Sequence, residues 1–287
     1  MTVERVANGE QYLEGRRFRL PLDRGVLVMG VLNVTPDSFY DGGRFIDPER
    51  AVSHGLELVS QGADILDIGG ESSRPGADPV SAEEELRRIL PVIRNLVQEV
   101  EVPISVDTYK AKVAQAALEE GAEIVNDISG LRFDPSLAKI AAEFRAPVVL
   151  MHTAGRPKKM QEMAQYQDLI PDILDALRDS IRRGLDAGIA EDKFVIDPGI
   201  GFGKTTLDNL RILKRLEAFH CLGRPILVGI SRKSFIGNVL NLPSEKRLEG
   251  SLAATVWAVV KGAKMIRTHD VCSTRRAIKM AEAIASS

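Results

Sequence analysis

The sequence has little of several features that mark particular classes of protein. It contains only two cysteines, Cys221 and Cys272, which lie far apart and fit no metal-binding spacing. We interpret both as reduced structural thiols, because a disulfide framework or a zinc site needs more cysteines. No apolar run approaches the roughly 18 residues that a membrane-spanning helix needs, and residues 1–15 contain no apolar signal-peptide core. We therefore expect a soluble, cytoplasmic protein with no membrane partner.

An excess of charge of either sign is also missing. The 38 Lys and Arg residues nearly balance the 40 Asp and Glu residues, which gives a net charge of −2. Proteins that bind nucleic acid or an anionic membrane usually present a basic surface, so neither partner is expected here. Single Arg and Lys residues can still bind a small anion locally. No linker-like stretch divides the 287 residues, a length that suits one large domain.

What the sequence does contain is a series of eight short apolar runs of strand length, each followed by polar or glycine residues. The runs are Leu27–Leu32, Ile65–Ile68, Pro103–Val106, Ile124–Val125, Pro147–Met151, Phe194–Asp197, Pro225–Ile230 and Met265–Ile266. Because the same polar ending recurs, the runs predict parallel strands whose carboxyl ends meet on one rim.

Segments with helical apolar spacing separate these runs. They are Pro48–Gly62, a helix begun by a Ser81/Glu84 capping box, Tyr109–Glu120, Pro135–Phe144, Asp168–Ala187, Thr206–Phe219, Ser251–Lys261 and Ser273–Ala285. The alternation predicts an α/β protein with a single-domain (β/α)8 TIM barrel at residues 25–287. Residues 1–24 are predicted to form an N-terminal segment in which Phe18–Leu22, before a turn at residues 23–25, contributes a short hairpin that caps the barrel bottom.

Two further segments depart from an ordinary barrel. Residues 34–47 and 72–80 carry prolines and glycines that forbid regular structure, and we expect them to form long loops over the rim. The helix at Ser251–Lys261 has almost no polar face. An outer helix of a barrel should present polar residues to solvent. The lack of a polar face here indicates that the helix packs against a partner, and we expect a homodimer.

The candidate site lies where the strands end. Asp197 closes an apolar run and is followed by Pro198 and by alternate glycines, which let the main chain approach a ligand closely. The rim also offers further carboxylate, amide, hydroxyl and cationic groups. They are Asn33, Ser73, Arg74, Asp107, Asn126, Ser231, Lys233, Arg267 and His269. Such a set can bind a flat heterocycle rich in donors and acceptors on one side and a phosphate group on the other.

Plainer interpretations exist for the individual residues. A strand-end Asp can simply cap the next helix, and His269 can be structural, although Arg267 shares its face of the strand and favours an anion site. The role of His152 stays open. The ending Gly203-Lys204-Thr205 is similar to a phosphate-binding loop, but Pro198 stands where that motif needs its first glycine.

Taken together, the strand-end motifs resemble those of the dihydropteroate synthase family over nearly the whole chain. The matching blocks are MGVLNVTPDSF at 29–39, DIGGESSRPG at 67–76, SVDT at 105–108, VNDISG at 125–130, LMH at 150–152, DPGIGFGK at 197–204, GISRKS at 229–234 and IRTHD at 266–270. So many ordered blocks are highly specific. One departure is Ser73, where the family often has Thr, although the hydroxyl is retained.

The resemblance implies a transferase of folate biosynthesis that condenses (7,8-dihydropterin-6-yl)methyl diphosphate with 4-aminobenzoate, giving 7,8-dihydropteroate and diphosphate, and that is a target of sulfonamides. It implies that the pterin contacts Asp107, Asn126, Asp197 and Lys233, near Met151 and Phe202. The diphosphate would lie on Asn33, Ser73, Arg74, Arg267 and His269, with Thr268 beside them. It also implies Mg²⁺ held by Asn33 and phosphate oxygens. The implied catalytic residues are Asp107, Lys233, Arg267 and His269.

A mechanism can be built from these groups. An aromatic amine is a weak nucleophile, so we expect diphosphate to leave first, with cationic groups neutralising it while Asp107 and Asp197 stabilise the pterin cation. Asp41 or Phe39 could line the aminobenzoate pocket, and Ser231 could bind its carboxylate. Two alternatives remain at this stage: a pterin-binding methyltransferase domain, and a barrel that binds pterin without turnover.

Overall fold

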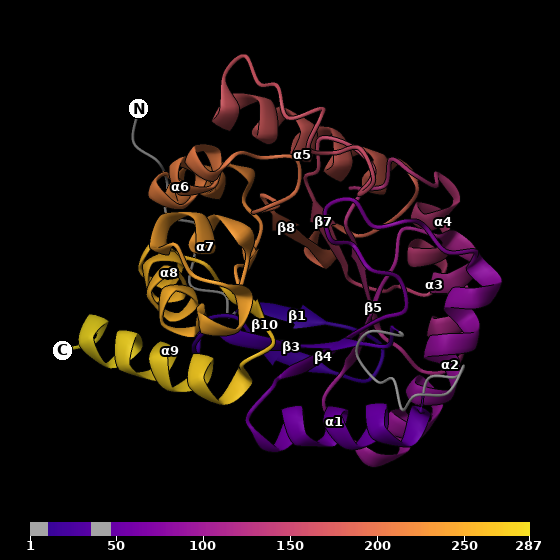
Figure 1. Cartoon of the computed structure of the whole chain (residues 1–287). Coiled ribbons are helices and arrows are strands. Elements are labelled where there is room, and N and C mark those ends of the chain that lie inside the picture. The colour runs from indigo at the N-terminus through magenta and orange to yellow at the C-terminus, as the bar shows by residue number, and fades with distance from the viewer. Residues whose placement is uncertain (1–10, 36–46) are drawn as a thin grey trace.

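The structure is a computed structural model that describes residues 11–35 and 47–287. In Figure 1 the strands form a ring and the helices surround it. The strands of the ring are β3 (Leu27–Asn33), β4 (Ile65–Gly69), β5 (Ile104–Asp107), β6 (Ile124–Asp127), β7 (Val148–Met151), β8 (Phe194–Asp197), β9 (Leu227–Gly229) and β10 (Met265–Thr268). All eight expected strands are therefore present.

Helices connect consecutive strands, as the spacing predicts. They are α1 (Pro48–Ser60), α2 (Ala82–Glu99), α3 (Ala111–Glu119), α4 (Ser136–Glu143), α5 (Leu169–Asp186), α6 (Thr206–Lys214), α7 (Ser234–Leu240), α8 (Leu248–Val260) and α9 (Val271–Ala285). Within the described part of the chain, no helix combines the length and the apolar character needed to cross a lipid bilayer.

The sheet is parallel and closes on itself. Its strand order is β8-β7-β6-β5-β4-β3-β10-β9, and a parallel bridge between Ile196 and Ile226 joins the two ends. The backbone N–H of Ile196 also donates to the carbonyl oxygen of Pro225, at 2.9 Å. The closed ring of parallel strands with helices outside confirms the (β/α)8 barrel.

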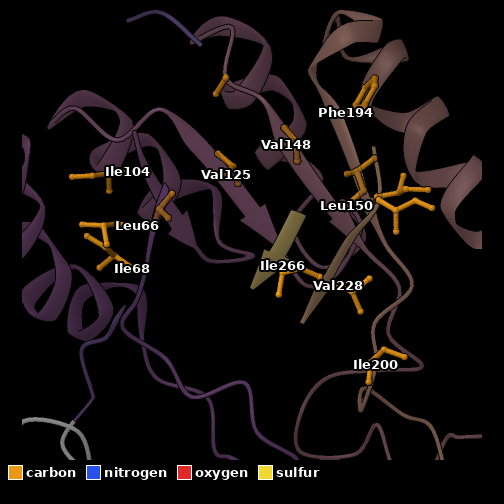
Figure 2. Close-up of a cluster of buried hydrophobic side chains, with 14 of the residues drawn as sticks. Leu66, Ile68, Ile104, Val125, Val148, Leu150, Phe194, Ile200, Val228 and Ile266 are labelled. Atoms are coloured by element: carbon orange, nitrogen blue, oxygen red, sulfur yellow. The ribbon is translucent and has the colours of Figure 1, made fainter. Parts of the chain in front are cut away.

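Two apolar layers hold the barrel together. The outward side chains of the strands pack against the helices, and Figure 2 shows several of them, including Leu66, Val125 and Val228. The inward side chains fill the lower half of the barrel. These are Leu27, Met29, Ile65, Ile124, Val149, Val195, Leu227 and Met265. Burial of an apolar side chain of this size stabilises a fold by about 1.5–3 kcal/mol, so this inner layer is a packed core.

A hairpin covers the lower end of the barrel, as expected, but its turn lies elsewhere. Strand β1 (Tyr12–Glu14) pairs antiparallel with β2 (Arg19–Pro21), so the turn lies between these strands and not at residues 23–25. Leu13 and Leu22 pack on the inner core from below. The sequence reveals only the second strand, because Phe18–Leu22 alternates weakly while the residues around β1 show no such alternation.

Two helix predictions need correction. Ser81 Oγ accepts from the Glu84 N–H as predicted, but a reciprocal capping box forms at Thr205 and Asp208 instead. The segment predicted as one helix from Thr206 ends at Lys214 and continues as a 3₁₀ helix, η2 (Leu216–Leu222), because Arg215 leaves the helical conformation. Helix α7 was not predicted; it is too short to show a full apolar period.

Candidate active site

Strand alternation places a polar layer directly above the apolar core. A residue two positions further along a strand faces the same way, so the inward apolar side chains are each followed by an inward residue nearer the rim. The pairs are Ile65 and Asp67, Ile124 and Asn126, Val149 and Met151, Val195 and Asp197, and Met265 and Arg267. The carboxyl ends of the strands therefore form a bowl with an apolar floor and polar walls.

Arg267 is at the centre of this bowl. Its Nε donates to Asp67 Oδ2 at 2.6 Å, and its Nη2 donates to Asp107 Oδ2 at 2.7 Å. Asn126 Nδ2 donates to the same Asp67 oxygen at 3.0 Å. One guanidinium thus holds two carboxylates in place. The planar group has several N–H donors in fixed directions, which suits it to binding two carboxylates at once.

Burial changes the protonation of the bowl. Removal from water raises the pKa of Asp107 to about 7, although the positive charge of Arg267 opposes the shift. The carboxylate of Asp67 adds to it. The pKa of Arg267 is raised further above its ordinary value by the two carboxylates, against the cost of its own burial. At neutral pH, Asp107 therefore lies near its titration midpoint, a feature common at functional sites.

Asp197 and Lys233 form the opposite wall. Asp197 Oδ1 accepts from the Gly199 N–H at 2.7 Å, and burial raises the pKa of Asp197 while Lys233 lowers it. Lys233 Nζ donates to the carbonyl oxygen of Ile200 and lies 4.7 Å from the centre of the Phe202 ring. Burial lowers the pKa of Lys233 to about 8, against the attraction of Asp197.

An apolar cluster lines one side of the bowl. Tyr109, Ile128 and Met151 are buried together, and Phe133 and Phe202 pack against them. The rings of Tyr109 and Phe133 meet edge to face, with centroids 5.4 Å apart. A flat aromatic ligand could lie against this wall, in which Met151 is buried and Phe202 is partly buried.

His269 and Ser231 meet at the rim beside the bowl, close to several arginine side chains. His269 Nδ1 lies 3.1 Å from Ser231 Oγ. The imidazole reaches solvent, yet its crowded surroundings lower its pKa to about 4, and the positive charges of Arg267, Arg232 and Arg74 add to the effect. His269 is thus neutral at pH 7 in this state and offers a hydrogen bond. An arriving anion would raise its pKa and favour the charged form.

Thr268 does not share this site. Its Oγ1 lies 3.0 Å from Thr274 Oγ1 on α9 and accepts from the Asp270 N–H at 3.1 Å. Because neighbouring residues of a strand face opposite ways, Arg267 points into the bowl while Thr268 points toward the helices. The expectation that the Thr268 side chain binds substrate is therefore corrected.

Asn33 ends β3 at the same rim, and its amide has no hydrogen-bond partner among the described residues. The described residues contain no group of three or more His, Cys, Asp or Glu side chains that could hold a metal ion. A lone amide oxygen does fit Mg²⁺, which often takes few protein ligands beside phosphate oxygens and water. Ser73 and Arg74 lie in the β4–α2 loop. Phe39 and Asp41 lie outside the described residues.

Contacts join the β4–α2 loop to the β7–α5 loop at the carboxyl ends of the strands. In the β4–α2 loop, the Gly76 N–H donates to the Pro157 carbonyl oxygen at 3.0 Å, and Lys158 Nζ pairs with Asp78 Oδ1 at 2.6 Å. Glu71 anchors the same loop, since it accepts from Tyr109 and Lys110. The segment at residues 72–80 is thus tied to the β7–α5 loop beyond it.

Sequence reasoning missed three buried polar residues. Asp67 lies inside an apolar run, where a carboxylate is itself a signal. Lys204 belongs to a motif that is incomplete for phosphate binding, and the sequence assigns no role to His152. In the structure Lys204 Nζ lies 2.9 Å from His152 Nδ1, and both side chains are buried.

A separate cavity of about 660 Å³ lies outside the bowl. Residues 164–170 and one side of α6 line it, with charges of both signs that include Asp168, Asp208 and Arg211. None of the residues of the polar layer belongs to it, so the chemistry suggested by the bowl does not involve this cavity.

The fold and the polar bowl can be compared with those of known proteins. The family described as pterin binding enzyme matches residues 29–269. Since that range spans the barrel from β3 to His269, fold and site together define a pterin-binding enzyme.

Individual relatives show which pterin-binding enzymes this chain is similar to. Dihydropteroate synthase of Bacillus subtilis is 49% identical over 274 residues, which cover 96% of this chain and 94% of the relative. A structure of Xanthomonas albilineans dihydropteroate synthase with 4-aminobenzoic acid has a TM-score of 0.91 and 44% identity, covering 97% and 100% of the two chains. A Yersinia pestis dihydropteroate synthase in a sulfonamide drug complex also gives 0.91 and 44%, covering 96% and 100%. The chain belongs to the dihydropteroate synthase family.

Proposed function

We propose that this protein condenses (7,8-dihydropterin-6-yl)methyl diphosphate with 4-aminobenzoate to give 7,8-dihydropteroate and diphosphate. The observation that carries the proposal is the joining of Asp107 and Arg267 in one bowl with Asn126, Asp197 and Lys233. Family membership supports the same reaction, and the sulfonamide complex of the Yersinia pestis relative supports sensitivity of this protein to sulfonamides.

In this proposal the pterin lies in the bowl with its ring edge toward the polar walls. Carboxylates accept from the ring N–H and amino groups, and Asn126 and Lys233 donate to ring nitrogen and carbonyl oxygen. Met151 and Phe202 cover the ring. The leaving diphosphate extends to the rim. There Ser73, Arg74, Arg267, His269 and Asn33 surround it, and Ser231 binds the carboxylate of 4-aminobenzoate.

The carbon–oxygen bond to diphosphate breaks before the amine attacks. As it breaks, Arg267 and Arg74 neutralise negative charge on the leaving group, while His269 donates a hydrogen bond to it. The pterin methylene becomes a cation conjugated with the ring, and the ionised Asp107 and Asp197 stabilise it. The nitrogen of 4-aminobenzoate then bonds to the methylene and loses a proton. The β4–α2 loop excludes water that would otherwise capture the cation.

Asn33 would hold Mg²⁺ together with the diphosphate oxygens. The ion supplies charge neutralisation for the leaving group. The side-chain amide of Asn33, which has no hydrogen-bond partner among the described residues, supports this assignment. The remaining steps use the residues named above.

The test is direct. Purified protein is mixed with Mg²⁺, the pterin diphosphate and 4-aminobenzoate, and released diphosphate and dihydropteroate are measured. Formation of both in equal amounts is expected. Binding of the pterin without product would instead indicate a barrel that binds without turnover.

We also propose a homodimer in the cytoplasm. Large apolar side chains are exposed along α6, α7, α8 and α9, which lie together on one flank of the barrel (Figure 1). They are Leu207, Leu210, Val239, Leu240, Trp257, Val260, Met280 and Ile284. Such a patch favours association, and the low polarity of α8 supports a second copy as its partner. The two free thiols support a reducing compartment.

A further inference from the structure

We propose that Lys204 is a positioning residue that holds the β8–α6 loop, residues 198–203, in the shape that the pterin site needs. The inference rests on the proposed function and adds a residue to it. Lys204 would act through the loop and would not touch the substrate.

Lys204 makes three contacts through one atom. Its Nζ donates to His152 Nδ1 at 2.9 Å, to the Phe202 carbonyl oxygen at 3.0 Å and to the His152 carbonyl oxygen at 3.3 Å. Burial lowers the pKa of Lys204 to about 7, against the attraction of Asp197, and in its ammonium form these three acceptors use all of its donors. Two of them belong to the end of β7 and one to the loop, so the side chain joins the loop to the sheet.

The imidazole of His152 is suited to accept this bond. Burial lowers the pKa of His152 well below its ordinary value, and the positive charge of Lys204 lowers it further. The ring is therefore neutral, with Nδ1 free to accept from Lys204. The backbone N–H of His152 donates to the Asp197 carbonyl oxygen at 3.0 Å, which links the end of β7 to the strand that carries Asp197.

The β8–α6 loop packs tightly against Lys204 and His152. Gly199 has φ of 73°, and a Cβ at that position would meet the His152 carbonyl oxygen at 1.8 Å and Lys204 Nζ at 3.3 Å. The main chain therefore passes directly against the pair. Other contacts fix the loop from its far side: Tyr166 Oη donates to the Gly203 carbonyl oxygen at 2.7 Å, and the Gly201 N–H donates to Asn209 Oδ1 at 2.7 Å.

Several parts of the bowl depend on this loop. Its Gly199 N–H binds Asp197 Oδ1, its Ile200 carbonyl oxygen accepts from Lys233, and its Phe202 ring lies beside Lys233 Nζ. A shift of the loop would therefore disturb a carboxylate, an ammonium and an aromatic wall together. Small misplacements of binding groups cost affinity and turnover out of proportion to their size.

The decisive variant is Lys204→Met, which keeps most of the side-chain volume and removes the donors. Lys193→Met is the matched control. Lys193 is also largely buried, with its side chain 15% exposed, and its Nζ donates to a carbonyl oxygen, that of Glu14, but at the hairpin below the barrel. Affinity for the pterin diphosphate is measured by calorimetry with Mg²⁺, well below both melting temperatures, alongside kcat and KM.

We expect Lys204→Met to weaken pterin binding about tenfold or more, since three buried acceptors lose their donor, while the Lys193 variant loses stability at unchanged affinity. If Lys204→Met does not fold, Lys204→Gln, which keeps an N–H donor, should show a smaller loss in the same direction. Wild-type affinity in a folded Lys204 variant would overturn the inference. Failure of the wild-type protein to form product would instead count against the proposed function.

Discussion

At the residue scale, the charge balance of the bowl depends on Arg267. It pairs with both Asp67 and Asp107, and Asp67 is completely buried. Removing one partner from such a group leaves an uncompensated buried charge, which costs more than the pair contributes. The residues of the bowl should therefore respond to substitution as a unit.

Substitution of Asp107 tests its proposed electrostatic role. Asp107→Asn retains the shape and one acceptor but removes the negative charge that would stabilise the pterin cation. We expect kcat to fall by about 100-fold or more, with the far-ultraviolet circular dichroism spectrum unchanged. Wild-type turnover in the folded variant would show that this charge is not needed.

The pH dependence follows from two shifted groups. The pKa of Asp107 is raised to about 7 and that of Lys233 is lowered to about 8. Since the reaction needs the carboxylate and the ammonium, kcat/KM should rise as pH increases through about 7 and fall through about 8. Lys233→Met should lose the part of the alkaline limb near pH 8, and the part due to Lys204, whose pKa burial lowers to about 7, should remain. A flat profile from pH 6 to 9 in the wild type would contradict the assignment.

The raised pKa of Asp107 also affects the stability of the fold. The folded-state pKa of Asp107 lies above its unfolded value, so its contribution to stability is complete below about pH 4. This contribution is lost as pH rises through about 7. The charged form used in catalysis is thus the less stable one in the empty bowl.

The sequence predicts single residues well where a strand ends in a polar group. Asn33, Asp107, Asn126, Asp197 and Arg267 all reach the rim because parallel strands end on one side. Prediction from the sequence fails where the direction or the burial of a side chain determines its role. Thr268 follows Arg267 directly, and yet its side chain points to α9. The neutral state of His269 likewise depends on neighbours from distant segments.

At the element scale, the β8–α6 loop contains the most crowded glycine of the described residues, Gly199. Gly199→Ala would combine a left-handed backbone with a Cβ pressed against the His152 carbonyl oxygen. We expect the free energy of unfolding to fall by at least about 3 kcal/mol. Gly223→Ala is the control, since its φ is 64° and no atom lies within 4 Å of its Cβ. It should cost only about 1 kcal/mol. Equal losses in chemical denaturation would show that crowding at Gly199 is unimportant.

The β4–α2 loop should become ordered when the anion site is filled. The Asp78–Lys158 pair is exposed to solvent and holds the loop only weakly. Diphosphate with Mg²⁺ should slow cleavage within residues 72–80 by a non-specific protease, because Ser73 and Arg74 would then have a ligand. Cleavage near η3 (Ser244–Lys246) should not change. Unaltered cleavage at residues 72–80 would argue against closure.

Elements are predictable from the sequence when local signals agree. Helices α1, α5 and α9 have clear apolar periods and were found within a few residues. The hairpin turn, the break after Lys214 and helix α7 escaped prediction because each is decided by packing over a few residues.

At the scale of the whole molecule, the flank formed by α6 to α9 should govern assembly. Val260 at the end of α8 is 68% exposed. Val260→Glu would bury a charge in the proposed dimer interface, which is strongly unfavourable, so we expect monomers in light scattering after size-exclusion chromatography. Leu56→Glu on α1, away from this flank, should leave the dimer intact. A wild-type monomer at micromolar concentration would rule out the interface.

The barrel as a whole is the most predictable feature. Eight strand-length runs separated by helical segments leave few other topologies, because parallel strands need crossover connections and these have one hand. A barrel also implies closure between β8 and β9, and the parallel bridge between Ile196 and Ile226 confirms it. The sequence does not reveal how short this closing contact is.

The hairpin below the barrel affects how ligands enter and leave. Leu13 and Leu22 pack on the inner core from below, so the bowl opens only at the carboxyl ends of the strands. A molecule bound deep in the bowl must therefore arrive before one that binds nearer the opening. The hairpin and the inner core together leave only this route of entry.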